Sequence, residues 1–195
     1  MAMANNKKYD DIVNAARKQF FRYGLKRVTI EDVCREANVS KMTFYKHFHN
    51  KTGLAKTVLD IVFSESANEF KELMRSEAPF YDKMHRMVKW KIDRDKAVSA
   101  EFVREIYSLP GVDSEITSYL KKIIRKGLKG VVDEFATAQK RGLVRQDIKP
   151  TLLIAMLDKA VEITADEKVL QTYDNIHDLT EDITKFFIYG IINEK

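Results

Sequence analysis

The stretch from Val28 to Lys51, VTIEDVCREANVSKMTFYKHFHNK, constrains the fold of this chain more than any other. It contains two short amphipathic segments, residues 30–37 and 41–47, separated by the tight joint 38–40. Two short helices with a joint of this length form a helix-turn-helix, whose second helix lies in the major groove of DNA. The sequence therefore predicts a DNA-binding unit near the N-terminus.

The residues at the two helix starts and in the joint suit the conformations that such a unit needs. Thr29 precedes the first segment and Asp32 follows three residues later, a pair that resembles a capping box. Ser40 is placed to cap the second segment in the same way. Asn38 stands in the joint, where asparagine is one of the few non-glycine residues that accept a positive φ. We therefore expect both helices to start directly after these caps.

Positive charge is concentrated in the same part of the chain. Residues 1–57 contain 12 Lys and Arg against 5 Asp and Glu, whereas residues 58–195 contain 22 against 24. The net charge of +5 is therefore the sum of +7 in the first part and −2 in the second. Lys and Arg that neutralise phosphates release counterions, so this segregation favours a nucleic acid partner. A solvated basic face is the simpler alternative, and the coincidence with the helix-turn-helix disfavours it.

Few turn-forming residues interrupt the rest of the chain. With 7 Gly and 3 Pro in 195 residues, and with no segment that alternates with period two, we predict an all-α fold of about nine helices. A fourth helix over residues 52–76 has about 25 residues and spans roughly 37 Å at 1.5 Å per residue. We expect it to connect a helix-turn-helix DNA-binding domain, residues 1–51, to a larger C-terminal helical domain, residues 52–195. The other predicted helices are 8–23, 80–95, 97–108, 113–141, 150–165 and 178–192.

Cysteine content and hydropathy limit the compartment and the chemistry. The one cysteine excludes an intramolecular disulfide and any site with several cysteine ligands. Residues 1–11 have no apolar run of the kind found in a signal peptide, and no apolar run in the chain approaches the ~18 residues of a membrane span. We therefore expect a cytoplasmic protein with no membrane partner, no metal and no other cofactor.

Four segments of the opening stretch, residues 29–33, 37–41, 43–48 and 50–51, resemble the signature of TetR-like (tetracycline-repressor-like) transcriptional regulators. The resemblance implies a small three-helix DNA-binding domain. It also implies a larger helical domain with an effector pocket and a dimer face, which the last two helices build as a four-helix bundle.

Three positions depart from the commonest pattern of that family. Asn38 stands where glycine is usual, and asparagine tolerates the same backbone conformation. Cys34 stands where alanine is usual, which is an exchange of one small residue for another. Met42 stands where glycine is frequent, at a position that can touch the groove. The departure at Met42 therefore affects the choice of target sequence and not DNA binding itself.

The second helix divides its side chains between the core and the DNA. Phe44 and Phe48 are four residues apart and face the core, which directs the other side chains elsewhere. Flexible polar groups meet base edges, and a methionine can touch a thymine methyl. Hydroxyls and cations near helix ends contact phosphates. We expect base contacts from Lys41, Met42, Thr43 and His47. We expect phosphate contacts from Thr29, Ser40, Tyr45, Lys46 and Lys51.

Two other interpretations of this region are weaker. Cys34 could be a redox sensor or a buried, inert thiol. Because it lies on the apolar face of a short helix, the inert thiol is favoured. His47 and His49 could be metal ligands, but two residues apart on or near one helix their side chains diverge. Because no cysteine or carboxylate cluster lies beside them, a metal site is disfavoured. Tyr45 as a core aromatic is disfavoured because Phe44 and Phe48 already fill the inner face.

The residues that would bind an effector are harder to identify from the sequence. Aromatic residues line adaptable apolar cavities, so Trp90, Phe102 and Tyr107 are the best pocket candidates, with plain core as the competing interpretation for each. The last two helices carry more apolar residues than a peripheral pair needs, which indicates a dimer interface. Its predicted residues are Leu153, Ala160, Val161, Ile183, Phe186, Phe187 and Gly190.

The function that follows is a homodimeric, ligand-responsive, sequence-specific DNA-binding transcriptional regulator. We expect a repressor that a small-molecule effector releases from a near-palindromic operator on double-stranded DNA. A DNA-binding protein of the same fold without a small-molecule effector is the alternative. An all-α enzyme is a third interpretation, but the sequence has no nucleophile–base pair, metal cluster or phosphate loop to support it. We therefore expect no enzymatic activity.

Overall fold

A computed structural model describes residues 2–108, 114–164 and 166–191. Within these ranges the chain forms ten α-helices and no strand, which confirms the all-α prediction. The helix added to the predicted nine is α9, a single turn in the polar interval before the last helix. No helix in the described part of the chain is long and apolar enough to cross a membrane. The helices are α1 (Ala2–Tyr23), α2 (Ile30–Glu36), α3 (Lys41–His47), α4 (Lys51–Arg75), α5 (Phe80–Lys96), α6 (Ala100–Ser108), α7 (Ser114–Lys140), α8 (Pro150–Ile163), α9 (Glu167–Leu170) and α10 (Ile176–Ile191).

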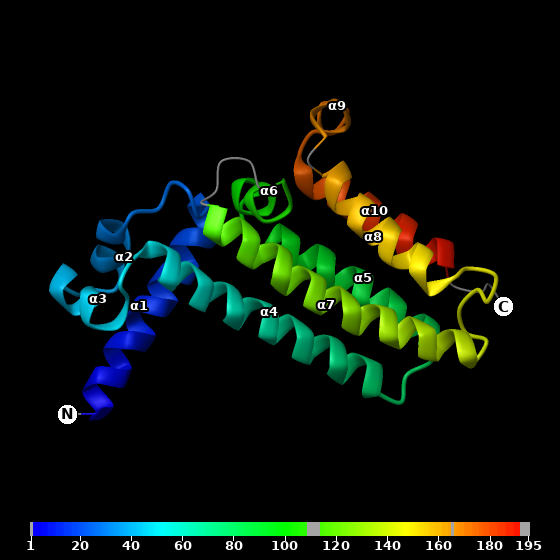
Figure 1. Ribbon diagram of the computed structural model, residues 1–195, viewed down its shortest axis with the longest axis horizontal. Coiled ribbons are helices and arrows are strands. Elements are labelled where there is room, and N and C mark those ends of the chain that lie inside the picture. The colour runs from blue at the N-terminus through cyan, green and yellow to red at the C-terminus, as the bar shows by residue number, and fades with distance from the viewer. Residues whose placement is uncertain (1, 109–113, 165, 192–195) are drawn as a thin grey trace.

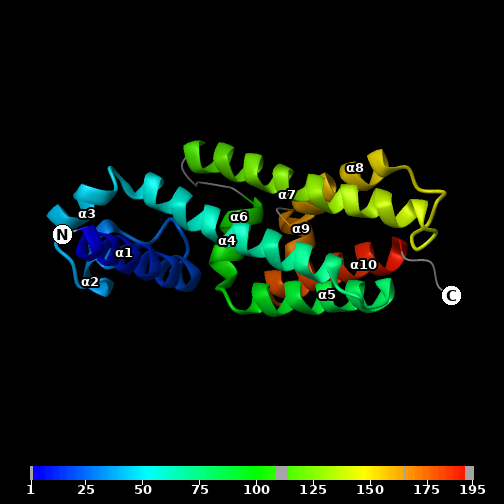
Figure 2. The same cartoon turned by 90° about the horizontal axis from the view of Figure 1, so that it is seen from below.

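The helices form an elongated molecule with the first three at one end (Figure 1). The helix α4 starts beside α3 and runs along most of the body, with α7 next to it in both views (Figure 2). The helix α10 packs on α5, and α8 contacts α7. The short α9 stands away from the rest of the helices (Figure 1). The helix α4 therefore runs from the first three helices into the larger body.

One hydrophobic cluster joins the first three helices to the body. It contains Ile12 and Phe20 of α1, together with Phe44 of α3, all without solvent exposure. It also contains Leu54 of α4 and Leu120 of α7, both fully buried. Burying a large apolar side chain contributes about 1.5–3 kcal/mol. The first three helices are therefore stabilised in part by a side chain of α7, far beyond residue 51.

A second cluster holds the opposite end of the molecule together. It is built by Met84 of α5, Phe135 of α7, Leu153 of α8 and Phe187 of α10. These side chains come from helices that lie side by side at the end distant from α3 (Figure 2). The two long helices α4 and α7 therefore connect two separately packed regions.

Candidate nucleic-acid interface

The joint between α2 and α3 has the backbone conformation that its sequence predicts. Asn38 has a φ of 51°, the one positive φ at a non-glycine residue in the described chain. The N–H of Val39 donates to the carbonyl of Cys34 at 3.0 Å, and the N–H of Asn38 donates to that of Arg35 at 3.3 Å. These bonds close the end of α2 and turn the chain into α3.

Both predicted caps are present. The N–H of Asp32 donates to Thr29 Oγ1 at 3.2 Å, and the N–H of Thr29 donates to Asp32 Oδ2 at 3.0 Å, which completes a capping box. Hydrogen bonds from Thr29 lower the pKa of Asp32, since they stabilise its charged form. Ser40 Oγ accepts from the N–H of Thr43 at 3.1 Å and lies 3.0 Å from the Thr43 hydroxyl. Both α2 and α3 are therefore fixed at their N-termini by local hydrogen bonds.

The helix α3 separates an inner face from an outer one. Phe44 and Phe48 are buried, as predicted, and their rings lie 5.8 Å apart. On the outer side, Met42 is 71% exposed and Tyr45 and Lys46 are exposed as well. A single exposed apolar side chain is ordinary on a protein surface, but here Met42 and Tyr45 are exposed together with Lys46 on one short helix. The outer face of α3 is therefore available to a ligand.

Lys41 lies on the exposed side but is not free. Its ammonium forms an ion pair with Glu31 of α2. The hydrogen bond between them raises the pKa of Lys41 and lowers the pKa of Glu31. A base or phosphate contact by Lys41 must therefore replace the contact with Glu31.

His47 is turned differently from the outward direction expected for it. Its ring packs edge-on against Tyr9 of α1, with centroids 6.0 Å apart. Its Nε2 is buried and has no hydrogen-bond partner among the described residues. The Tyr9 ring also stacks on Phe48 at 5.2 Å. His47 therefore lies between α3 and α1, at the edge of the outer face.

Lys51 was expected to contact a phosphate, and the structure shows another use for it. Its Nζ donates to the carbonyls of Leu25 at 2.9 Å, Lys26 at 3.2 Å and Val28 at 2.9 Å. Burial lowers the pKa of Lys51, and the nearby Glu105 carboxylate acts in the opposite direction. The Lys51 ammonium therefore holds the loop between α1 and α2 in place.

Glu105 of α6 is a residue of this region that the sequence did not indicate. Its carboxylate is buried and accepts hydrogen bonds from the N–H groups of Leu25 and Lys26, the latter at 3.0 Å. Burial raises the pKa of Glu105, and the two backbone hydrogen bonds oppose that rise. No local pattern could have linked this carboxylate to a loop 80 positions earlier.

Cys34 is buried, and burial raises the pKa of its thiol, which suits an inert side chain. The described residues contain no group of three or more His, Cys, Asp or Glu side chains placed to hold a metal ion.

The predicted effector residues lie in different surroundings. The Trp90 indole N–H donates to Glu69 of α4, and the Arg94 guanidinium lies 5.2 Å from its ring centroid. Phe102 is buried in the first hydrophobic cluster, where its ring centroid is 5.0 Å from that of Phe21. The side chain of Tyr107 lies outside the described residues. Of these predicted effector residues, Trp90 and Phe102 therefore lie in different surroundings in the structure.

The predicted interface residues fall into three groups. Leu153 and Phe187 are buried in the second cluster, so they offer little surface to another chain. Phe186 and Gly190 are exposed. Ala160 and Ile183 are partly buried, and the side chain of Val161 lies outside the described residues.

A helix-turn-helix with an exposed second helix, carried on a larger all-helical body, defines this protein as a DNA-binding protein. Residues 12–58 match the family model described as bacterial regulatory proteins, tetR family. The uncharacterized HTH-type transcriptional regulator YhgD of Bacillus subtilis (strain 168) is 29% identical over 131 residues, which cover 60% of this chain and 68% of YhgD.

Solved structures share the fold over nearly the whole chain. The transcriptional regulator FadR of Bacillus subtilis, in complex with stearoyl-CoA, superposes with a TM-score of 0.69 at 16% identity and covers 94% of this chain and 99% of its own. A regulator from Saccharomonospora viridis, in complex with choline, superposes with a TM-score of 0.68 at 16% identity and covers 100% of both chains. The chain therefore resembles TetR-family transcriptional regulators in the sequence of its helix-turn-helix part and in its overall fold.

Proposed function

We propose that this chain is a homodimeric repressor that binds a near-palindromic operator and leaves it when a small-molecule effector binds. The observation that carries the DNA-binding part is the outer face of α3. Met42 protrudes there beside the exposed Lys41, Tyr45 and Lys46, while Phe44 anchors the helix from behind. Polar and cationic groups around an apolar tip match the mixture of phosphates, base edges and thymine methyls in a major groove.

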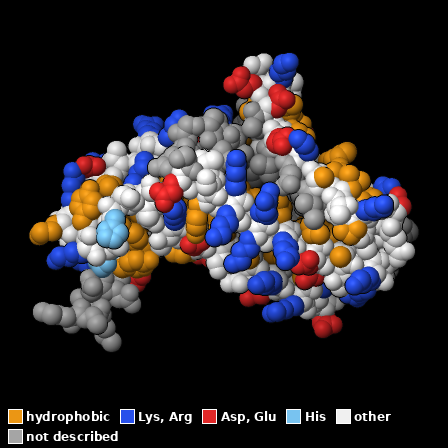
Figure 3. Space-filling view, in the orientation of Figure 1, with side chains coloured by type: hydrophobic (Ala, Val, Ile, Leu, Met, Phe, Trp, Pro, Cys, Tyr) orange, Lys and Arg blue, Asp and Glu red, His pale blue; other side chains and the backbone are white. Residues whose placement is uncertain are grey.

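Exposed apolar side chains on α8 and α10 support the homodimer. Leu152, Met156 and Ile163 recur along one face of α8, and Phe186 and Tyr189 are exposed on α10. Hydrophobic side chains gather over α8 on the surface of the molecule (Figure 3). Contiguous exposed patches of this kind mark interaction sites. A twofold pairing through this face gives two copies of α3, which require an operator with two half-sites about one DNA turn apart.

The effector part is supported by the fold. FadR of Bacillus subtilis is seen with stearoyl-CoA and the Saccharomonospora viridis regulator with choline, so this kind of helical body accommodates ligands of very different chemistry. In the proposed division, residues 1–51 bind DNA and residues 52–195 bind the effector and the second subunit. The effector acts by binding more tightly to a conformation in which the two α3 helices no longer match the operator, since equal affinity for both conformations would shift nothing. The role is regulatory, without catalysis, and belongs in the cytoplasm with the DNA.

Selection of bound fragments from a random DNA pool tests the DNA-binding part. We expect a recovered site of two inverted half-sites, bound by two copies of the chain in sedimentation. Recovery of no preferred sequence would overturn the proposal. A thermal-shift screen with acyl-CoA, choline and other small molecules then tests the effector part. A compound that raises the melting temperature must also lower operator affinity, and if none does so, the alternative of a regulator without a small-molecule effector replaces this part.

A further inference from the structure

The loop between α1 and α2 is held from two sides by charged groups that come from different helices. From α6, the Glu105 carboxylate accepts hydrogen bonds from the N–H groups of Leu25 and Lys26. From α4, the Lys51 ammonium donates hydrogen bonds to three carbonyl oxygens, those of Leu25, Lys26 and Val28. The same two residues, Leu25 and Lys26, are therefore bound by an anion through their N–H groups and by a cation through their carbonyls.

Gly24 allows α6 to approach this closely. It ends α1 with a φ of +80°, a conformation that favours glycine. A Cβ at this position would also lie 2.9 Å from Glu105 Oε2 and 3.0 Å from Glu101 Cγ. Both the backbone of the loop and the closeness of the carboxylate therefore depend on the absence of a side chain.

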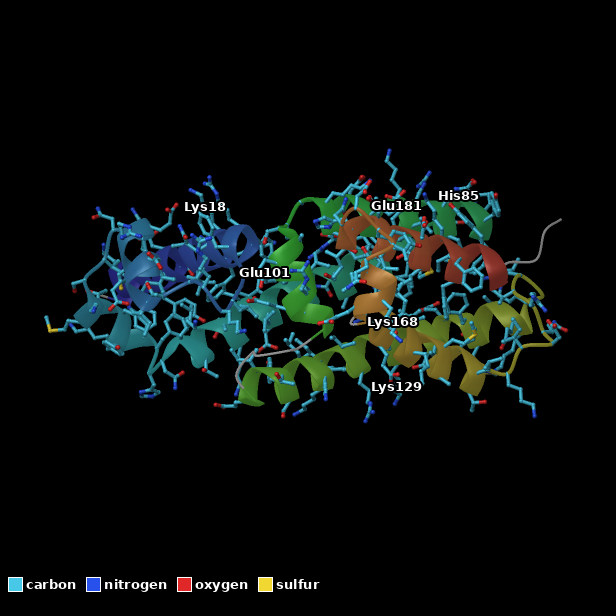
Figure 4. All side chains as sticks on the ribbon, turned by 90° about the horizontal axis from the view of Figure 1, so that it is seen from above. Lys18, His85, Glu101, Lys129, Lys168 and Glu181 are labelled. Carbon is cyan, nitrogen blue, oxygen red and sulfur yellow. The ribbon has the colours of Figure 1, made fainter. Side chains whose placement is uncertain are left out.

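Further contacts attach α6 to the end of α1. The N–H of Ser99 donates to the carbonyl of Phe21 at 2.7 Å, and the Phe21 and Phe102 rings lie 5.0 Å apart. The helix α6, which carries the labelled Glu101, lies beside the end of α1 (Figure 4). A hollow of about 520 Å³ opens next to this joint and is lined by Arg22, Tyr23, Lys26, Arg27, Glu101 and Glu105. The charged groups near Glu105 are therefore Arg22 of α1, Lys26 and Arg27 of the loop, Lys51 of α4 and Glu101 of α6.

We propose that Glu105 is a positioning residue for DNA binding, which fixes the direction of α2 and α3 relative to the body by holding the loop against Lys51. A carboxylate has acceptors for both N–H groups, whereas the amide of a glutamine would turn an NH₂ donor toward one of them. Because the N–H of Leu25 is buried and that of Lys26 is partly buried, the loss of one acceptor is costly and releases the loop from α6. The helix-turn-helix then stays folded on its own caps and on Phe44, but its orientation is less well defined.

A distance measurement tests this directly. Spin labels at Met42→Cys on α3 and Lys126→Cys on α7, both exposed positions, are introduced into a Cys34→Ala background. Pulsed dipolar spectroscopy, with labelled subunits diluted into unlabelled ones, then reports the distribution of distances within one chain. We expect a narrow distribution for the parent and a broader or displaced one for Glu105→Gln. Glu101→Gln is the matched control, because Glu101 lies on the same helix, is exposed, and pairs only with Arg104 at 3.4 Å among the described residues.

Affinity provides a second readout. Glu105→Gln should lower affinity for the selected operator by about tenfold, while affinity for random DNA, which tolerates many orientations, stays unchanged. An unchanged distance distribution in folded Glu105→Gln protein overturns the proposal, and so does equal weakening on operator and random DNA. If Glu105→Gln does not fold, Glu105→Asp keeps the charge on a shorter side chain and should broaden the distribution to an intermediate extent. The affinity measurement rests on the proposed function, because it needs a selected operator. If no operator can be selected, the proposed function is wrong, and the distance measurement still tests the role of Glu105.

Discussion

Phe186 and Phe187 are neighbours in α10 and have opposite surroundings: Phe186 is 73% exposed, whereas Phe187 is 7% exposed and packs in the second hydrophobic cluster. The boundary between the core and the exposed surface of this chain therefore passes between two identical side chains. This difference separates an effect on pairing from an effect on folding.

If the proposed dimer forms through this face of α10, Phe186→Glu should prevent it with little change in the free energy of unfolding of the subunit. A charge placed in an apolar interface has to be buried without a partner, which disfavours association. Sedimentation at several concentrations measures the association. Phe187→Ala is the contrasting variant and should lower the free energy of unfolding by about 3–5 kcal/mol, as expected for a large core side chain. A Phe186→Glu protein that still dimerises would exclude this face as the interface.

Lys51→Met should mainly destabilise the fold. The carbonyls of Leu25, Lys26 and Val28 lose their shared donor, at a cost of about 1–3 kcal/mol in urea unfolding. Lys46→Met is the matched control, because Lys46 is exposed on α3 and has no ion pair with a described residue. It should leave stability within about 0.5 kcal/mol and reduce the salt dependence of DNA binding by about one unit. The reverse pattern for the two lysines would return Lys51 to the phosphate contacts.

Met42→Ala should change sequence preference and leave stability unaffected. Its side chain protrudes from α3, so truncation removes no core contact. If Met42 meets a thymine methyl, discrimination at one base pair of each half-site should fall by about 1–3 kcal/mol. Binding to a set of single-base operator variants measures this effect. A uniform loss across all variants would instead mean that Met42 contributes only general contact.

The capping box of α2 should make stability depend on pH in the acid range. Hydrogen bonds from Thr29 hold the pKa of Asp32 below its usual value of 3.8 in the folded chain. The carboxylate therefore contributes stability that is present above pH 3.8 and is lost as the pH falls through the lowered pKa. Urea unfolding of the wild type and Asp32→Asn should differ at pH 7 and converge below pH 3.8. A difference that persists at low pH would assign the effect to packing and not to ionisation.

The sequence was most informative where structure depends on neighbouring residues. The caps Thr29 and Ser40 and the positive φ of Asn38 were predictable because each acts within three or four positions of the chain. The inward direction of Phe44 followed from helical spacing alone.

Features that depend on distant segments were not accessible in this way. The α1–α2 loop binds Lys51 through its carbonyls, and no motif distinguishes such a lysine from one that faces a phosphate. Phe187 and Leu153 belong to apolar stripes that serve both a core and a surface, so their spacing could not show which side each one faces. Phe102 was considered for a pocket because it is aromatic, but its partner is Phe21 of α1.

The hydrophobic cluster around the DNA-binding helices contains Phe102 of α6 and both Ile116 and Leu120 of α7. A hybrid regulator made by joining residues 1–51 to the body of a different protein would put foreign side chains inside that cluster. Such hybrids will stay folded only if the new body supplies residues of matching volume at these positions. Engineers who want to exchange operator specificity between members of this fold will therefore have to transplant α6 and the first turns of α7 along with the helix-turn-helix.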